Sequence, residues 1–148
     1  MFFDDLPLGK KFETGTRVLD RDDIVRFARE WDPQPFHLDD EAAKASPYGG
    51  IIASGFHTIL VAFNLVLAAS DWSQSSMGSP GMANIEWIKP VYVGDTIMVK
   101  SEVVSARASR TKPDRGFVEL QNDIYNQHGV LVARYRGTHM LRMRPQAA

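Results

Sequence analysis

Residues 59–69 of this 148-residue chain are apolar on nearly every side, and this segment most restricts what the chain can fold into. Ser54 and Gly55 stand shortly before it, and serine is a favourable residue just ahead of the first turn of a helix. A helix that is apolar all round has to be covered by other parts of its domain. The sequence therefore predicts a helix that is buried within the domain.

The cover for this helix comes from segments with the alternating pattern of strands. Residues 11–19 alternate at period two, and after residue 81 the chain is almost entirely strand-like. The expected later strands are residues 82–88, 96–104, 117–125 and 130–143. Consecutive strands with short links form antiparallel sheets. We therefore expect an α+β fold that forms a single domain over residues 1–148. In this fold, a four-strand meander and the first strand make an antiparallel sheet, which is wrapped around a central buried helix.

Between the first strand and the apolar segment, the period changes to that of a helix. Ile24, Phe27, Ala28 and Trp31 follow at the spacing i, i+3, i+4, i+7, which predicts one apolar face of a short helix. Pro33 must end this helix. A second short helix is expected over residues 38–45, because acidic residues gather at its start, where the helix dipole favours them.

Asp32 and His37 stand five residues apart, with Pro33 and Pro35 between them. Each proline fixes its own φ and pushes the preceding residue out of the helical region, so we expect this segment to be stiff and non-helical. A carboxylate and an imidazole on stiff backbone can serve as an acid/base pair that shares one water. The alternative is that Asp32 ends a helix and His37 is a polar loop residue.

Gly55 falls in the first turn of the apolar helix, where backbone amides lack a partner within the helix. Such an amide can donate to a carbonyl oxygen on which negative charge develops. The alternative is that Gly55 only lets another segment pack closely. His57 can face a cleft or pack against its neighbours, and packing is the favoured expectation.

Charge and composition exclude several kinds of function. The formal net charge of −1 gives no reason to expect nucleic acid or an anionic membrane as a partner. The absence of cysteine excludes disulfides, thiolate catalysis and Cys-ligated metals. His128 and His139 have no ligand partner at a zinc-type spacing. Acids stand at the N-terminus where a signal peptide carries basic residues, so we expect a cytoplasmic protein. Residues 59–69 are too short an apolar run to span a bilayer. No cluster of metal ligands stands out in the sequence, and neither a metal nor a cofactor is expected.

The segment Asp32-Pro33-Gln34-Pro35-Phe36-His37 resembles the Asp-x-Asn-Pro-apolar-His motif of the MaoC-like dehydratases, which include the (R)-specific enoyl-CoA hydratases of the hotdog fold. Residues 38–43, 50–56 and 89–96 also resemble this family, in the same order along nearly the whole chain. Two positions depart from its pattern. Gln34 stands where the motif has Asn, and Ser54 stands where these hydratases often have His.

This resemblance implies syn hydration of a trans-2-enoyl thioester to the (R)-3-hydroxyacyl thioester, or the reverse dehydration. Asp32 and His37 would hold one water, and the Gly55 amide would polarise the thioester carbonyl. The implied substrate-contacting residues are Gln34, Phe36, Ser54 and His57. Which of Asp32 and His37 is the base stays open, because a coupled pair does not allow a clean assignment. Acyl length, the carrier (coenzyme A or acyl carrier protein) and the direction also stay open, and a homodimer with substrate near its interface is implied.

Two other functions stay open at this point. One is a non-catalytic hotdog subunit that binds acyl thioesters, in which Gln34 reflects lost chemistry. The other is a thioesterase, which is disfavoured because residues 59–69 contain no acid. The basic stretch 105–116 could bind the phosphates of coenzyme A, but a solvated connection between strands is favoured. Trp31, Trp72 and Trp87 are expected in the core or at an interface.

Overall fold

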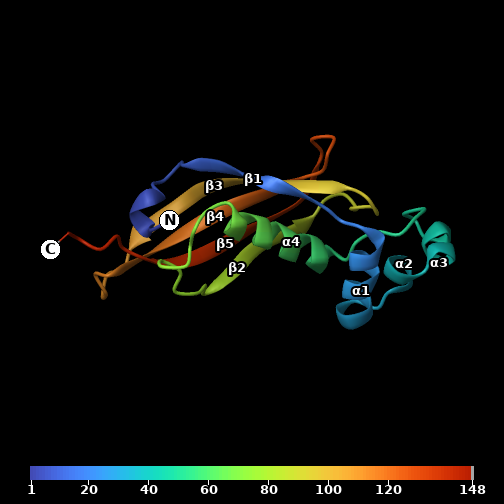
Figure 1. The fold of residues 1–148 in the computed structure, drawn as a ribbon, viewed down its shortest axis with the longest axis horizontal. Helices are drawn as coiled ribbons and strands as arrows, with labels where there is room; N and C mark the ends of the chain where they lie inside the picture. Colours follow the sequence, from blue (N-terminus) through green and yellow to red (C-terminus); the bar gives the residue numbers. More distant parts are fainter. Residues whose placement is uncertain (148) are drawn as a thin grey trace.

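The structure is a computed structural model, and it describes residues 1–147. Its helices and strands follow one another as a short 3₁₀ turn η1 (Phe3–Asp5), β1 (Lys11–Val18), α1 (Arg21–Trp31), α2 (Pro35–Leu38), α3 (Asp40–Ala45), α4 (Gly55–Ala68), β2 (Gly81–Trp87), β3 (Thr96–Ala108), β4 (Arg115–Tyr125) and β5 (Leu131–Arg142). Figure 1 shows one sheet with α4 against it and α1, α2 and α3 grouped beyond one end. The α+β class predicted from the sequence is confirmed.

The five strands form one antiparallel sheet in the order β1-β3-β4-β5-β2. Only β3, β4 and β5 make a meander, so the expectation of a four-strand meander is wrong for β2. Residues 88–95 carry the chain from β2 at one edge to β3 next to the other edge, and Ile52 bridges Tyr92 in this crossing segment. The crossing leaves β2 as an edge strand, in which every residue is exposed.

The helix α4 is the apolar segment that the sequence predicts, and Gly55 lies in its first turn, as expected. It contacts β1, β3 and β5, and its buried residues join those of the sheet in one core. The expectation that this helix is buried all round is wrong for one side. Phe56 is 61% exposed and Leu60 is 53% exposed, so an apolar strip of α4 stays uncovered in a single chain.

The first helix, α1, begins after Asp20, whose carboxylate accepts from the Asp23 amide at 2.8 Å. Ile24 and Ala28 are buried, but Trp31 at the end of the helix is 69% exposed, so the apolar face is one residue shorter than expected. The expectation that residues 32–37 are non-helical is wrong for Pro35, Phe36 and His37, which lie in α2. Pro35 is the first residue of α2, where its fixed φ suits a helix and its missing N–H costs nothing.

The hairpin of β3 and β4 corrects the expected basic connection. The strands run to Ala108 and from Arg115, so Arg107 and Arg115 belong to strands and not to a connection. The hairpin tip lies at the end of the sheet opposite to α1, α2 and α3 (Figure 1). No helix within residues 1–147 has the length and apolar composition that crossing a membrane requires.

Candidate active site

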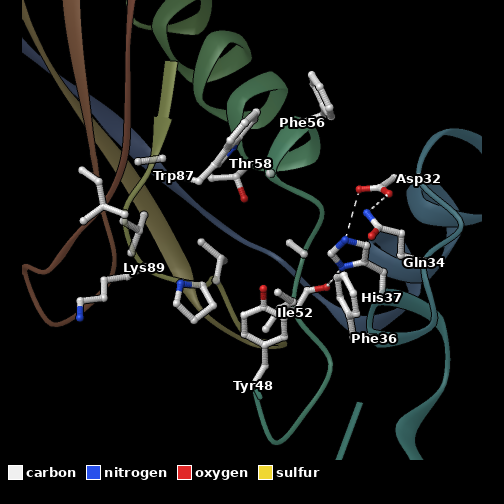
Figure 2. A pocket seen from close by; sticks show the side chains of 17 residues that line it. Asp32, Gln34, Phe36, His37, Tyr48, Ile52, Phe56, Thr58, Trp87 and Lys89 are labelled. Carbon is white, nitrogen blue, oxygen red and sulfur yellow. Dashed lines mark hydrogen bonds and ion pairs between the residues drawn. The ribbon is translucent and has the colours of Figure 1, made fainter. Parts of the chain in front are cut away.

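Asp32 and His37 face each other across the break between α1 and α2. Asp32 terminates α1, and the Asp32 amide donates to the Ala28 carbonyl at 2.9 Å. His37 lies in α2, whose direction Pro35 sets. The resulting distance from Asp32 Oδ2 to His37 Nε2 is 3.2 Å (Figure 2). The local sequence, two short helices separated by proline-stiffened backbone, is what brings these side chains together.

The hydrogen bonds of the pair fix where its proton can move. His37 Nδ1 lies 2.6 Å from the Ile52 carbonyl oxygen, which can only accept, so Nδ1 carries a hydrogen. Nε2 is then the nitrogen that gains or loses a proton, and it faces Asp32. A carboxylate and a bare Nε2 are both acceptors. The pair is therefore stable when Nε2 is protonated or when a water donates to both groups.

Gln34 holds the other oxygen of the carboxylate. Its Nε2 donates to Asp32 Oδ1 at 2.6 Å. Burial alone would raise the pKa of Asp32, but the Gln34 hydrogen bond, the nearby Ser54 hydroxyl and the His37 imidazole outweigh burial and hold the pKa below its ordinary value. Asp32 is therefore a carboxylate at neutral pH, and its free oxygen is directed toward His37.

A pocket of about 490 Å³ opens beside this pair. Asp32, Gln34, Phe36, His37 and Gly55 line it, which brings together five of the seven residues that the sequence singles out. Figure 2 shows the Asp32–His37 pair on one side of the pocket and Lys89 on the other. Apolar side chains such as Ile88, Val91 and Val132 make much of the remaining wall. The pocket thus combines a polar, titratable side with an apolar one.

Gly55 is the first residue of α4 and reaches this pocket with its backbone. Within residues 1–147 the Gly55 amide donates to no protein acceptor, as its place at a helix start predicts. Gly55 also lets another residue pack closely. A Cβ atom added there would lie 2.5 Å from Cε2 of Trp87 and closer still to Nε1. Both sequence-based readings of this glycine, the open amide and the close packing, are compatible with its surroundings.

Ser54 and His57 lie outside the residues that line the pocket. The Ser54 hydroxyl is buried without a hydrogen-bond partner in the described chain and reaches the site only through its effect on the pKa of Asp32. His57 packs, as the favoured expectation had it. Its ring stacks on Phe27 with 4.7 Å between centroids, and burial lowers its pKa, so the imidazole is neutral.

Several further residues line the pocket that the sequence did not single out as site residues, among them Tyr48, Thr58, Trp87 and Lys89. The sequence could have indicated Thr58, because Thr58 follows Gly55 by three residues and lies on the same face of α4. His57 does not lie on that face. Lys89 stands at the start of the motif 89–96. In the described part of the chain no group of three or more His, Asp or Glu side chains is arranged to hold a metal ion.

Comparison with known proteins gives a consistent result. The model of the MaoC-like domain matches residues 5–122. The Bacillus subtilis protein YdeM, described as uncharacterized, is 33% identical over 132 residues, which are 89% of this chain and 92% of YdeM. Mesaconyl-CoA hydratase of Cereibacter sphaeroides is 33% identical over 91 residues, but the match covers only 26% of that enzyme.

Solved structures agree with these sequence matches. The MaoC-like dehydratase from Rhodospirillum rubrum superposes with a TM-score of 0.90 at 35% identity, over 99% of both chains. A Mycobacterium tuberculosis protein described as a double hotdog fold superposes with a TM-score of 0.78 at 24% identity, over all of this chain and 46% of that one. The sheet wrapped around α4 is therefore a hotdog fold, as the family resemblance implies.

Proposed function

This chain belongs to the MaoC-like domain family, and from that membership we propose that it is a hydro-lyase that hydrates trans-2-enoyl thioesters to (R)-3-hydroxyacyl thioesters or catalyses the reverse dehydration. The observation that carries the proposal is the 3.2 Å approach of Asp32 Oδ2 and His37 Nε2 in a pocket that also contains the open Gly55 amide. A carboxylate, an imidazole and an unpaired amide are the groups that this reaction needs.

In the hydration direction, one water lies between Asp32 and His37 and its oxygen adds to Cβ of the enoyl group. One proton of the water passes to the pair, and the electrons of the C=C bond move toward the thioester carbonyl to form an enolate. The pair then delivers one proton to Cα on the same face, so that H and OH are added in total. His37 Nε2 is the ring position that exchanges, because Ile52 keeps the hydrogen on Nδ1.

The Gly55 amide stabilises the enolate oxygen in this scheme. It lies at the N-terminal, positive end of α4, where no carbonyl of the protein competes for it. Gln34 orients Asp32 through its 2.6 Å hydrogen bond. Gln34 thus stands at the place of the Asn in the family motif and holds the carboxylate of Asp32. This contact supports an active enzyme over the alternative of a subunit that has lost its catalytic activity.

We further propose that two copies of the chain pair through β2 and the exposed strip of α4. The edge strand β2 leaves backbone hydrogen-bonding groups unpaired, and Met82, Ile85 and Ile88 on or beside it are 39–43% exposed. Phe56 and Leu60 of α4 extend this apolar surface. A second copy would cover both features by continuing the sheet across the β2 edge.

The experiment that tests the function is a panel of enoyl thioesters of increasing acyl length, on coenzyme A and on acyl carrier protein. We expect loss of the enoyl absorbance for at least one member, with the (R)-3-hydroxyacyl product identified by chiral analysis. Binding without turnover of any member would favour the alternative, a non-catalytic acyl-thioester-binding subunit. An (S) product would contradict the proposed placement of water and carbonyl.

A further inference from the structure

Trp87 ends β2 and covers the first turn of α4. The atom of the protein nearest to a Cβ built on Gly55 is Trp87 Nε1, followed by Cε2 at 2.5 Å and Cδ1 at 2.7 Å. Trp87 also lines the pocket that contains Asp32 and His37. Figure 2 shows Trp87 beside the start of α4 with Thr58 next to it. The indole nitrogen is therefore the part of the ring that lies closest to Gly55, whose amide has no acceptor among the residues that the structure describes.

The distance between the two nitrogens has an upper bound. Standard bond lengths put a Cβ about 2.5 Å from the amide nitrogen of its own residue. Nε1 lies nearer to that Cβ position than the 2.5 Å of Cε2, so Trp87 Nε1 and the Gly55 nitrogen are at most about 5 Å apart. One oxygen can therefore lie within about 3 Å of both nitrogens, the distance that an oxyanion donor requires.

The indole N–H is also free to point at such an oxygen. A Cβ built on Gly55 is nearly equally far from Nε1, Cε2 and Cδ1 of Trp87, so Gly55 lies over the face of the indole ring at Nε1. The indole N–H bond lies in the plane of the ring. The N–H bond therefore does not point at Gly55. Trp72 Nε1 donates to the Val66 carbonyl at 3.3 Å, whereas among residues 1–147 Trp87 Nε1 donates to no acceptor. Tryptophan N–H groups in partly apolar surroundings usually have a partner.

The position of the indole is fixed from two sides. Phe56 meets the ring edge-on at 5.4 Å between centroids. The backbone after it is tied to β5, because the amides of Ile88 and Lys89 both donate to the Val132 carbonyl, at 2.8 and 3.0 Å. A donor that is held before the substrate arrives needs little reorganisation when charge develops.

We propose that Trp87 Nε1–H is a second donor beside the Gly55 amide, so that the thioester carbonyl oxygen is bound by two N–H groups and its enolate charge is shared between them. This inference rests on the proposed function and adds a catalytic residue to it. It also explains why Trp87 packs closely on a glycine, because a side chain at position 55 would displace the indole nitrogen.

The kinetic test is Trp87→Phe, which keeps an aromatic ring and removes the N–H. Loss of one oxyanion donor lowers kcat by about 10²–10³-fold. We expect kcat and kcat/KM for crotonyl-CoA to fall together, with KM nearly unchanged, because the donor acts mainly on the transition state. Trp31→Phe is the matched control, since Trp31 is 69% exposed and does not line the pocket, and it should keep the wild-type rate.

A second measurement on the wild-type chain keeps the test independent of that variant's folding. The chain has three tryptophans, so a ¹⁵N-labelled sample gives three indole N–H signals, which sequential assignment distinguishes. Butyryl-CoA has the thioester carbonyl but no double bond to hydrate. It should move the Trp87 N–H proton downfield, as a new hydrogen bond does, while coenzyme A without an acyl group should not.

Two results would overturn the inference: Trp87→Phe with kcat within about twofold of the wild type, or a Trp87 signal that responds equally to butyryl-CoA and to coenzyme A alone. Either result in an active wild-type enzyme leaves the proposed function standing and removes only the second donor. An inactive wild type would instead count against the proposed function, while the butyryl-CoA titration still decides whether the indole binds a thioester carbonyl.

Discussion

A methyl group added at Gly55 is expected to destabilise the protein through one contact. The new Cβ would lie 2.5–2.7 Å from two carbons of the Trp87 ring, whereas carbon atoms in contact are normally about 3.5–4.0 Å apart. The indole would have to move by about 1 Å or more. Overpacking of this kind typically costs about 1–3 kcal/mol, and we expect Gly55→Ala to lower the free energy of unfolding by that amount.

Removing the indole should remove this cost. In Trp87→Ala the added methyl group has no ring to meet, and alanine is a better helix former than glycine. The double variant should therefore be more stable than the sum of the two single changes predicts, with a coupling energy of about 1–3 kcal/mol. The assay is urea unfolding of all four proteins, followed by a spectroscopic signal that does not depend on Trp87.

Equal stability of Gly55→Ala and the wild type, together with additive effects of the two changes, would refute this prediction. That result would mean that the indole is not packed on Gly55. The proximity of Nε1 to the amide would then be lost as well. Thermal unfolding gives a second reading, because about 1 kcal/mol corresponds to about 2–4 °C in Tm for a chain of this size.

Two further predictions concern other parts of the chain. Burial holds the pKa of His57 below its ordinary value of 6.5. As the pH falls below 6.5, His57 therefore binds a proton in the unfolded chain before it does so in the folded chain. The free energy of unfolding should fall over this pH range. His57→Phe, which keeps the stack on Phe27, should lose less stability over that pH range, and parallel curves for both proteins would contradict this. Leu60→Glu places a charge on the exposed strip of α4 and should convert a dimer to a monomer in sedimentation. Leu8→Glu makes the same change at an exposed leucine just before β1, at the opposite edge of the sheet, and should leave the dimer intact.

The parts of the site that depend on adjacent residues could be predicted from the sequence. Asp32, Gln34 and His37 stand within one short segment, and the prolines restrict its backbone so strongly that their proximity follows from local geometry. The position of Gly55 at a helix start follows from Ser54 and the apolar run after it. The one local error concerned Pro35, which opens α2 because a proline is excluded from helix interiors and not from the first position.

The parts that depend on distant residues could not be predicted in the same way. Trp87 reaches Gly55 only because β2 pairs with β5 at the sheet edge, and period-two alternation does not say which strand lies next to which. The lowered pKa of Asp32 depends on Ser54, from a distant part of the sequence, as well as on Gln34 and His37. The uncovered strip of α4 was missed for a related reason, since an apolar face looks the same in the sequence whether the same chain or another copy covers it.

The exposure of the pair agrees with its proposed role. The His37 side chain is 4% exposed and that of Asp32 is 17% exposed, so both are shielded from bulk water but accessible from the pocket. A substrate that fills the pocket would exclude further water and leave one molecule between the two groups. Changes at either residue should therefore affect the chemical step more than the binding of the thioester.

The most direct test of the account is the initial rate of crotonyl-CoA hydration by Asp32→Asn and His37→Ala beside the wild type. General acid–base groups contribute about 10²–10⁴-fold each, so each variant should lose at least that factor in kcat while its thermal unfolding stays cooperative. Removing His37 leaves the buried Ile52 carbonyl without its partner, so some loss of Tm is expected there without loss of the fold. A folded variant of either kind that hydrates crotonyl-CoA at the wild-type rate would contradict the claim that Asp32 and His37 activate one water between them.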